Sequence, residues 1–333
     1  MSWSRFRRLC AAVLMAAGVL TVPGTAQASP VSCEDVYVPV RILLLPQTVY
    51  GRLCTPEGAR TVMVLVPGST YTSHYWDIDT RPENSFRRSM NQAGLATLTV
   101  DRLGTGRSSK PLSALVSAVT EAEAMHGVVQ RMRGRFDRVL IGGHSLGSAI
   151  SILEAGRYRD VDGVLLTGFT PRLDVVSAVP VFASLIPATL EPQFLGLDPG
   201  YLTTSPGTRY SSFHAPGVVQ EDLIADDERT KSVVSVAEPV DTIVLNNYVL
   251  PAALAIRAPV MLVMADGDEH FCGPPLGSDC SSAEGLKASE GHYYGEGVRL
   301  DTYVVRGYGH SFNYAPNAKD YHAAVATWAN SLR

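Results

Sequence analysis

One serine stands in a sequence setting that can make its hydroxyl reactive. Ser145 lies in the pattern Gly143-x-Ser145-x-Gly147, after the apolar run 139–141 and before the helix-like stretch 148–157. A serine at a tight strand-to-helix turn sits in strained backbone with its hydroxyl exposed, and the flanking glycines let strand and helix approach closely. The helix N-terminus also directs free N–H groups at whatever binds beside that hydroxyl. We therefore predict that Ser145 is a nucleophile.

A serine hydroxyl needs a neighbouring base, usually a histidine that a carboxylate orients. Of the eight histidines, His310 has the most suitable position, in a Gly-rich loop after the predicted strand 301–305. Two carboxylates, Asp266 and Asp268, directly follow the predicted strand 259–265. Loops at the carboxyl ends of parallel strands converge on one crevice, so both loops can reach the serine. The residues alone leave the choice between the two aspartates open.

An attacked carbonyl develops an oxyanion, which needs N–H donors. The backbone N–H of Leu146, the residue after the serine, is one expected donor. The other is expected from the loop that follows the apolar run 61–66. Two further histidines, His74 and His270, are candidates for the wall of the same crevice.

Strand-like and helical segments alternate along most of the chain. The predicted strands are 36–44, 48–53, 61–66, 95–100, 161–167, 259–265 and 301–305, with another ending at the serine turn. The predicted helices are 82–93, 114–133, 148–157 and 315–332. This alternation requires crossover connections, which predicts a mainly parallel sheet with helices on both faces. The first two strands are separated by a turn around Pro46 and predict an antiparallel hairpin.

Residues 170–257 interrupt this alternation, because they are rich in proline and show only short helical pieces. Inserted between two strands of the sheet, they are expected to form a helical cap over the strand ends, where ligands bind in such sheets. The alternative is an independent second domain, for which so short and proline-broken a stretch is poorly suited. We divide the chain into a core, residues 29–169 and 258–333, and a cap, residues 170–257.

Residues 1–28 have the three parts of a secretory signal peptide. Three arginines at 5–8 precede an apolar run at 9–20, and the small-residue triplet Ala26-Gln27-Ala28 follows. The apolar run is short for a membrane span, which disfavours a membrane anchor as the alternative. We expect cleavage after Ala28 and a secreted protein with no stable membrane anchor.

Four of the five cysteines lie beyond the signal peptide, and an even number in an exported chain predicts disulfides. Two local bridges, Cys33–Cys54 and Cys272–Cys280, are the simplest of the three pairings. The cysteine spacing does not resemble a zinc site, and the Gly-rich stretch 101–108 lacks the third glycine of a dinucleotide fingerprint. A net charge of −4 gives no basic footprint for nucleic acid. We therefore expect no metal, no cofactor and no nucleic-acid partner.

Over nearly all of the mature chain, these motifs resemble the α/β-hydrolase superfamily, and in particular its secreted esterases and lipases. The residues that carry the resemblance are Pro67-Gly68-Ser69, 101–108, 143–147, 265–268 and Gly309-His310. The resemblance implies an α/β-hydrolase fold and a catalytic triad of Ser145, Asp268 and His310, because relatives carry a Gly-x-x-Asp turn whose aspartate meets the histidine. It also implies an oxyanion hole formed by Ser69 and Leu146, with Thr70 as the second choice for the loop donor.

The resemblance further implies a secreted serine hydrolase that cleaves carboxylic esters through an acyl-enzyme intermediate. The expected partner is a small-molecule ester with a hydrophobic part. One alternative is a lactonase or acyl-transfer enzyme acting on a natural product. Epoxide hydrolases and dehalogenases of this fold use an aspartate nucleophile, so Ser145 counts against both. A non-catalytic binding protein on the same fold has no need for three ordered catalytic residues and a donor loop, which disfavours that reading.

Overall fold

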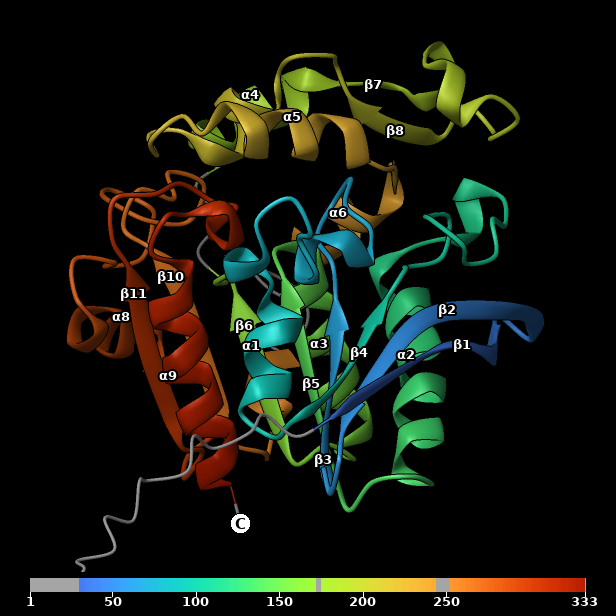
Figure 1. The fold of residues 1–333 in the computed structure, drawn as a ribbon. Coiled ribbons are helices and arrows are strands. Elements are labelled where there is room, and N and C mark those ends of the chain that lie inside the picture. Colours follow the sequence, from blue (N-terminus) through green and yellow to red (C-terminus); the bar gives the residue numbers. More distant parts are fainter. Residues whose placement is uncertain (1–29, 172–174, 244–251, 333) are drawn as a thin grey trace, which may run out of the picture.

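The computed structural model describes residues 30–171, 175–243 and 252–332. Within them, eight strands form one sheet in the order β1-β2-β4-β3-β5-β6-β10-β11 (Figure 1). The strands are β1 (Val31–Ile42), β2 (Leu45–Pro56), β3 (Thr61–Val66), β4 (Ala96–Val100), β5 (Arg138–His144), β6 (Gly163–Thr167), β10 (Val260–Ala265) and β11 (Leu300–Val305). From β4 to β11 all neighbours are parallel, whereas β1 and β2 are antiparallel. The prediction of a mainly parallel sheet is confirmed.

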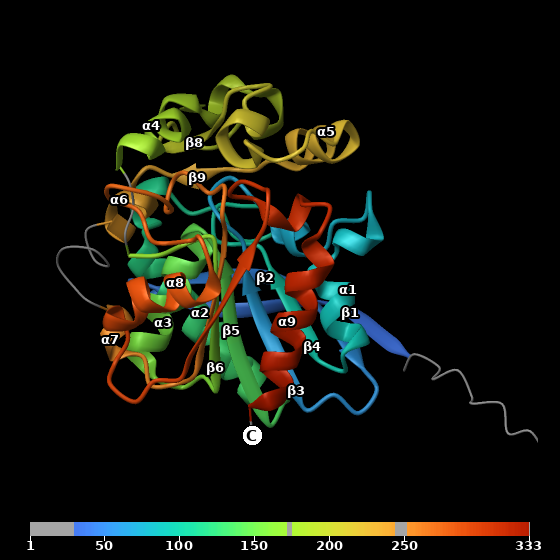
Figure 2. The ribbon, with the colours of Figure 1, turned by 90° about the vertical axis from the view of Figure 1, so that its left-hand side faces the viewer.

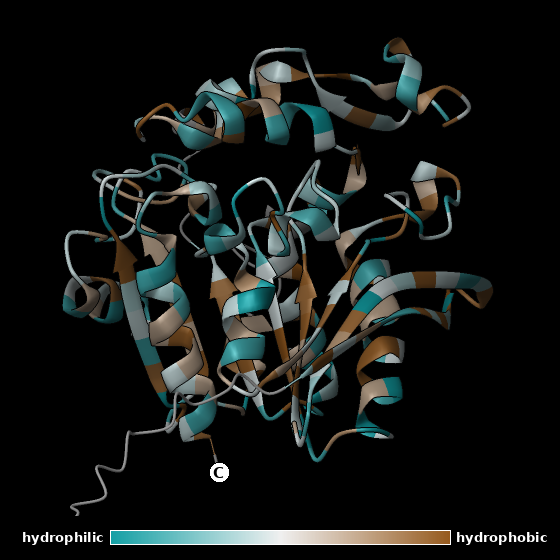
Figure 3. Cartoon of the chain, viewed as in Figure 1, coloured by the Kyte–Doolittle hydropathy of each residue, from teal (hydrophilic) through white to brown (hydrophobic). Residues whose placement is uncertain are grey.

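The central strands are buried on both faces. Every residue of β3, β4, β6 and β10 is buried. Continuous apolar runs of this kind are what parallel strands between two helix layers require. Figure 3 shows the contrast between the largely hydrophobic central strands and the helices, which alternate between hydrophobic and hydrophilic residues.

Helices cover both faces of the sheet (Figure 2). On one face α1 (Phe86–Gln92) packs against α9 (Ala318–Ser331), and on the other α2 (Ala118–Arg133) packs against α3 (Leu146–Tyr158). The buried apolar side chains accordingly form two clusters, one under each helix pair. Two shorter helices of the body are α7 (Ala252–Ala255) beside α3 and α8 (Ala283–Glu290) beside β11. No helix within the described residues is long and apolar enough to cross a membrane.

Serine caps explain where three of these helices begin. The side chains of Ser85, Ser117 and Ser282 each accept a hydrogen bond from the backbone N–H three residues further on. The predicted helices 82–93 and 114–133 start too early, because one-turn 3₁₀ helices precede the first two caps.

The N-terminal hairpin differs from the prediction in its turn. Strands β1 and β2 are joined by Leu43 and Leu44, both with positive φ (48° and 69°), whereas Pro46 lies inside β2. Positive φ at both central residues is typical of the tightest hairpin turns, which usually contain Asn or Gly, so the leucines gave no turn signal. Pro46 is tolerated because β4 pairs only with residues 51–54 of β2, which leaves an open edge beside the proline.

Residues between β6 and β10 form a layer above the carboxyl ends of the parallel strands (Figures 1 and 2). The elements of this layer are α4 (Val175–Ser184), β7 (Leu185–Pro187), β8 (Tyr201–Thr204), α5 (Glu221–Thr230) and β9 (Val234–Ser235). The strands form a three-stranded antiparallel sheet that the sequence did not predict, because two to four residues are too few to show alternation. After it, α6 (Ala237–Ile243) packs on α2 and α3. The predicted signal peptide lies outside the described residues.

Candidate active site

Ser145 occupies a strained turn between β5 and α3. Its φ is 53° and its ψ is −121°, and its N–H donates to the carbonyl of Thr167 at 2.8 Å. A Cβ on Gly143 would lie 2.0 Å from the backbone of Gly147, and one on Gly147 would lie 2.2 Å from the carbonyl oxygen of Val66. Only glycine fits at either position, so the two glycines allow the chain to place a serine at the apex.

Asp268 and His310 come together from two adjacent strands. Asp268 follows β10, His310 follows β11, and His310 donates from Nδ1 to Asp268 Oδ2 at 2.8 Å. Asp268 is fully buried and His310 is 4% exposed. The imidazole also stacks on Phe271, with ring centroids 5.7 Å apart. The stacking restrains the ring plane, and the hydrogen bond from Nδ1 to Asp268 leaves Nε2 facing away from the carboxylate, as a general base requires.

The other candidate acid, Asp266, has a different environment. Asp266 is exposed, its Oδ1 accepts a hydrogen bond from Gly307 N–H at 2.7 Å, and Arg306 lies 3.5 Å from its Oδ2. The carboxylate therefore ties together the loops after β10 and β11 at the surface. The geometry favours Asp268 as the partner of the histidine.

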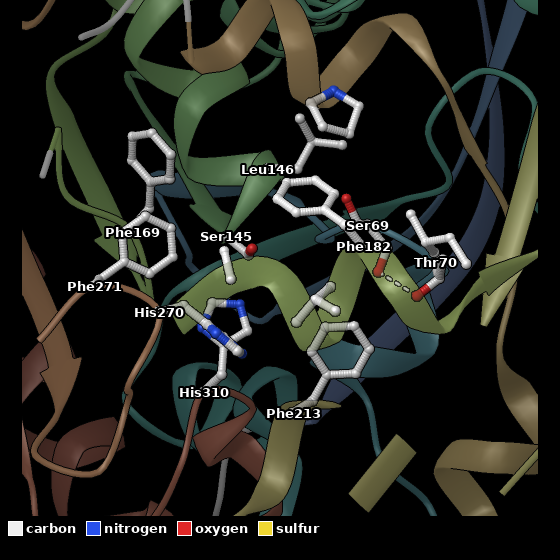
Figure 4. Close-up of a pocket in the computed structure, with 14 residues that line it drawn as sticks. Ser69, Thr70, Ser145, Leu146, Phe169, Phe182, Phe213, His270, Phe271 and His310 are labelled. Carbon is white, nitrogen blue, oxygen red and sulfur yellow. Dashed lines mark hydrogen bonds between the residues drawn. The ribbon is translucent and has the colours of Figure 1, made fainter. Parts of the chain in front are cut away.

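Ser145 and His310 line the same pocket (Figure 4). Within the described residues, no hydrogen bond joins the Ser145 hydroxyl to the imidazole. Such contacts are often long in unliganded active sites and tighten in the substrate complex. The arrangement therefore brings together the predicted nucleophile, base and acid in the chain order Ser145, Asp268, His310.

The predicted oxyanion donors also face this pocket. Ser69, Thr70 and Leu146 all line it. Leu146 is the first residue of α3, where backbone N–H groups have no partner inside the helix. A Cβ on Gly68 would lie 3.2 Å from Ser145 Cβ, so the loop after β3 runs directly against the serine turn. The two groups of amides can thus converge on one oxygen.

Thr70 is held by a buried network that sequence reasoning missed. Thr70 has a φ of 59°, and Arg209 Nη1 donates to its Oγ1 at 2.6 Å. Arg209 also donates twice to Asp227, which accepts from His214 Nε2 at 2.6 Å, and all three side chains are fully buried. Burial raises the pKa of Asp227, but the Arg209 charge and the His214 hydrogen bond outweigh burial and lower this pKa to about 2. The guanidinium lies over the ring of Tyr71, 4.2 Å from its centroid.

A second buried arginine holds the other end of the same loop. Arg102 donates from Nη2 to the carbonyls of Gly68 (3.2 Å) and Val233 (3.3 Å), and its Nη1 pairs with Glu238. Glu121 lies 4.0 Å from the same guanidinium. Burial, followed by the charge of Glu238, raises the pKa of Glu121 well above its ordinary value. Both arginine networks thus link the inserted segment to the loop that carries Ser69.

The remaining histidines near the site have separate roles. His144 is fully buried and stacks on Tyr75 at 4.2 Å, and burial, with the nearby His310, lowers its pKa well below the usual value. It is therefore a neutral wall behind His310. His270 lines the pocket as expected and donates from Nε2 to the carbonyl of Ser212 at 2.8 Å. His74 does not line the pocket, because its ring pairs with Asp226 at 2.7 Å.

The pocket wall is largely apolar. Its empty volume is about 710 Å³, counting the open mouth. Four aromatic side chains surround it, namely Phe169, Phe182, Phe213 and Phe271 (Figure 4). Phe182 comes from α4 and Phe213 from the same inserted segment, so residues of that segment form part of the wall.

Both predicted disulfide pairs are present. Cys33 and Cys54 are directly opposite in the β1–β2 register, which explains their pairing. Cys272 and Cys280 are joined after β10, and Cys272 N–H donates to the carbonyl of Asp268 at 2.9 Å. The second bridge therefore closes a loop whose first cysteine is hydrogen-bonded to the backbone of Asp268.

Comparison with known proteins identifies relatives. A family model described as "Alpha/beta hydrolase family" matches residues 63–326. A segment of 85 residues is 33% identical to Lipase 1 of Psychrobacter immobilis and covers 25% of this chain and 26% of that lipase, so the match spans about a quarter of the relative's length.

Two solved structures align over most of the chain. A thermostable carboxyl esterase from Bacillus coagulans aligns with a TM-score of 0.61 and 16% identity, over 90% of this chain and 99% of that one. A thermophilic esterase from Thermogutta terrifontis aligns with a TM-score of 0.59 and 14% identity, over the same shares. At these identities the alignments show the fold alone.

Proposed function

Since the chain belongs to the α/β-hydrolase family and has its fold, we propose that it is a secreted serine hydrolase that cleaves carboxylic esters through an acyl-enzyme intermediate. The observation that carries this proposal is the buried His310–Asp268 pair at 2.8 Å, whose histidine lines one pocket with the strained Ser145. Fold alone does not select a reaction, so the proposal rests on this site.

In the proposed reaction, His310 Nε2 takes the Ser145 hydroxyl proton as Ser145 Oγ bonds to the ester carbonyl carbon. The carbonyl oxygen gains the negative charge and accepts hydrogen bonds from the Leu146 and Ser69 amides. Collapse of the intermediate breaks the bond to the alcohol oxygen, which takes the proton from His310. Water, deprotonated by His310, then releases the acid and restores Ser145. Asp268 accepts a hydrogen bond from Nδ1–H throughout and stabilises the imidazolium, without itself taking the proton.

The substrate is proposed to be an ester with a hydrophobic part. The supporting observation is the aromatic lining from Phe169, Phe182, Phe213 and Phe271 around Ser145. Burying each methylene of a substrate chain contributes about 0.8 kcal/mol, so an apolar pocket should distinguish esters by chain length.

Secretion is part of the proposal and is supported by the two disulfides, Cys33–Cys54 and Cys272–Cys280. Disulfides persist mainly in oxidising compartments. Recovery of the mature chain beginning after Ala28 from the medium of secreting cells tests this part.

A panel of p-nitrophenyl esters from acetate to palmitate, together with simple lactones, tests the reaction. The expected result is ester hydrolysis that rises with acyl length until the pocket is filled and that is lost in Ser145→Ala. Faster turnover of lactones than of every ester would support the lactonase alternative. Absence of turnover on both panels by folded protein would contradict the proposed function.

A further inference from the structure

A cluster of potential metal ligands lies between α2 and α3. His126 on α2, Glu154 on α3 and Asp160 just after α3 place one imidazole nitrogen and two carboxylates together, with ligand atoms within 4.8 Å of one another. His126 Nδ1 lies 2.9 Å from Asp160 Oδ2 and 3.6 Å from Glu154 Oε1. None of the three lines the pocket of Ser145, so the proposed reaction does not account for the cluster.

Glu154 is the member of this cluster whose carboxylate has no hydrogen-bond partner among the described residues. Its side chain is fully buried. Asp160 Oδ1 is also buried and accepts no hydrogen bond from the described residues. A buried carboxylate is costly unless it is paired, hydrogen-bonded or bound to a metal. Two carboxylates with oxygens within 4.8 Å of each other, one buried and one partly buried, are stabilised by a cation that both can bind.

Arg133, whose charge acts on Glu154, is already engaged by other groups. Arg133 donates from Nε to the backbone carbonyl of Asp160 at 2.7 Å, and its Nη1 lies 3.0 Å from Asp162. The side chain of Gln130 donates to Asp160 Oδ2. These contacts orient Asp160 and leave the oxygens of Glu154 without a donor.

A second group of potential metal ligands, His74 with Asp79 and Asp226, differs from the cluster on α2 and α3 in its hydrogen bonds. Asp226 accepts hydrogen bonds from His74 Nε2 and Arg229 Nη2. Because the protein's own donors satisfy Asp226, that group does not need an ion. It provides a matched comparison for the cluster on α2 and α3.

The donor set and its geometry select the ion. An imidazole nitrogen with carboxylate oxygens suits Zn²⁺, whose bonds to such ligands are about 2.0–2.2 Å. The edge of a tetrahedron with bonds of that length is about 3.4 Å. This value lies between the 2.9 Å that separates His126 Nδ1 from Asp160 Oδ2 and the 3.6 Å that separates it from Glu154 Oε1. The His126 ring is fixed by stacking on Tyr158, with centroids 3.7 Å apart.

We propose that His126, Glu154 and Asp160 form a structural zinc site that ties the C-terminal end of α3 to α2. His126 is 31% exposed, so water can reach the fourth coordination position. The site is structural rather than catalytic, because it lies outside the pocket that holds Ser145.

The experiment uses the untagged mature protein with its disulfides intact. The protein is dialysed against EDTA, transferred to metal-free buffer and titrated with ZnCl₂ by calorimetry, and bound zinc is counted by elemental mass spectrometry. We expect one zinc per chain. Zinc at 100 times its Kd should raise the melting temperature by about 5 °C, by the linkage of binding to stability.

The variants separate this site from adventitious binding. His126→Asn removes a partly exposed ligand and Glu154→Gln a buried one, and both should lose the bound zinc and the rise in melting temperature. His74→Asn, the matched control from the satisfied cluster, should retain both. The proposal is overturned if wild type binds no more zinc than His126→Asn, or if Ca²⁺ rather than Zn²⁺ raises the melting temperature. These readouts do not depend on ester hydrolysis, so they are independent of the proposed function.

Discussion

Replacing Arg209 with lysine tests whether the inserted segment positions the loop that carries Ser69 and Thr70. Arg209 joins Thr70 Oγ1 at 2.6 Å to the Asp227 carboxylate through one planar guanidinium. Lysine keeps the positive charge beside Asp227 but cannot make both contacts, since its ammonium lacks the planar fork. The variant therefore removes the link to Thr70 while leaving Asp227 paired.

The expected loss of kcat in Arg209→Lys follows from the backbone conformation of Thr70. Its φ of 59° is in the left-handed region, which costs an L-residue about 1–2 kcal/mol. A hydrogen bond to a charged group contributes about 1.5–3 kcal/mol, which is enough to offset that strain. Without Arg209 the loop should relax and move the Ser69 amide. Loss of one oxyanion donor lowers kcat by about 10²–10³, so we expect a decrease of about tenfold to a hundredfold for a partly relaxed loop.

The assay compares kcat and KM on one p-nitrophenyl ester, with thermal unfolding of each variant. Arg229→Lys is the matched control, because Arg229 is on the same inserted segment and its side chain is 66% exposed. We expect Arg209→Lys to lower kcat with KM nearly unchanged and Arg229→Lys to leave both at wild-type values. A lower melting temperature with wild-type kcat in Arg209→Lys would refute the reasoning, since Arg209 would then be only structural.

Three further predictions follow from the site. Asp268→Asn should lower kcat by about 10⁴, because it favours the wrong histidine tautomer, whereas Asp266→Asn should stay near wild type in the same assay; the reverse order would exchange their roles. The pKa of Asp227 is lowered to about 2 in the folded protein. The ionised carboxylate therefore adds about 2 kcal/mol to the free energy of unfolding above pH 4. This contribution is lost as the pH falls towards 2, because the unfolded state binds the proton first. Urea unfolding of wild type should show this loss and Asp227→Asn should not; equal pH dependence in both would contradict it. Replacing Cys272 and Cys280 together with alanine should lower the free energy of unfolding by about 2–3 kcal/mol through loop entropy, which a lower melting temperature would show. The same variant should have a reduced kcat, because Cys272 N–H is hydrogen-bonded to the carbonyl of Asp268. Unchanged values would rule out this bracing role.

Features with a strong local signal could be predicted from the sequence. The strand 61–66 has the bounds of β3, because a continuous apolar run between Arg60 and the turn residues Pro67-Gly68 leaves little choice. The serine turn was predictable because a Cβ at either of its glycines would clash with the backbone, so that only glycine fits there. His310 was predictable because the ends of parallel strands meet at one edge of the sheet.

The features that the sequence did not reveal depend on contacts between distant residues. The pairing of Arg209 with Thr70 joins positions on different elements, and neither residue type has a spacing that indicates it. The three-stranded sheet formed by β7, β8 and β9 has strands too short to show periodicity. Buried polar networks and short strands are selected by tertiary contacts, which override local propensity.

The proposed reaction depends on Ser145 being a nucleophile that His310 activates. Reaction with a fluorophosphonate, followed by trypsin digestion and tandem mass spectrometry, measures this reactivity. We expect one adduct per chain, on Ser145 in the tryptic peptide 139–157, absent from Ser145→Ala and strongly slowed in His310→Ala. Equal labelling of Ser145→Ala, or an adduct on another serine of that peptide such as the buried Ser148, would contradict it.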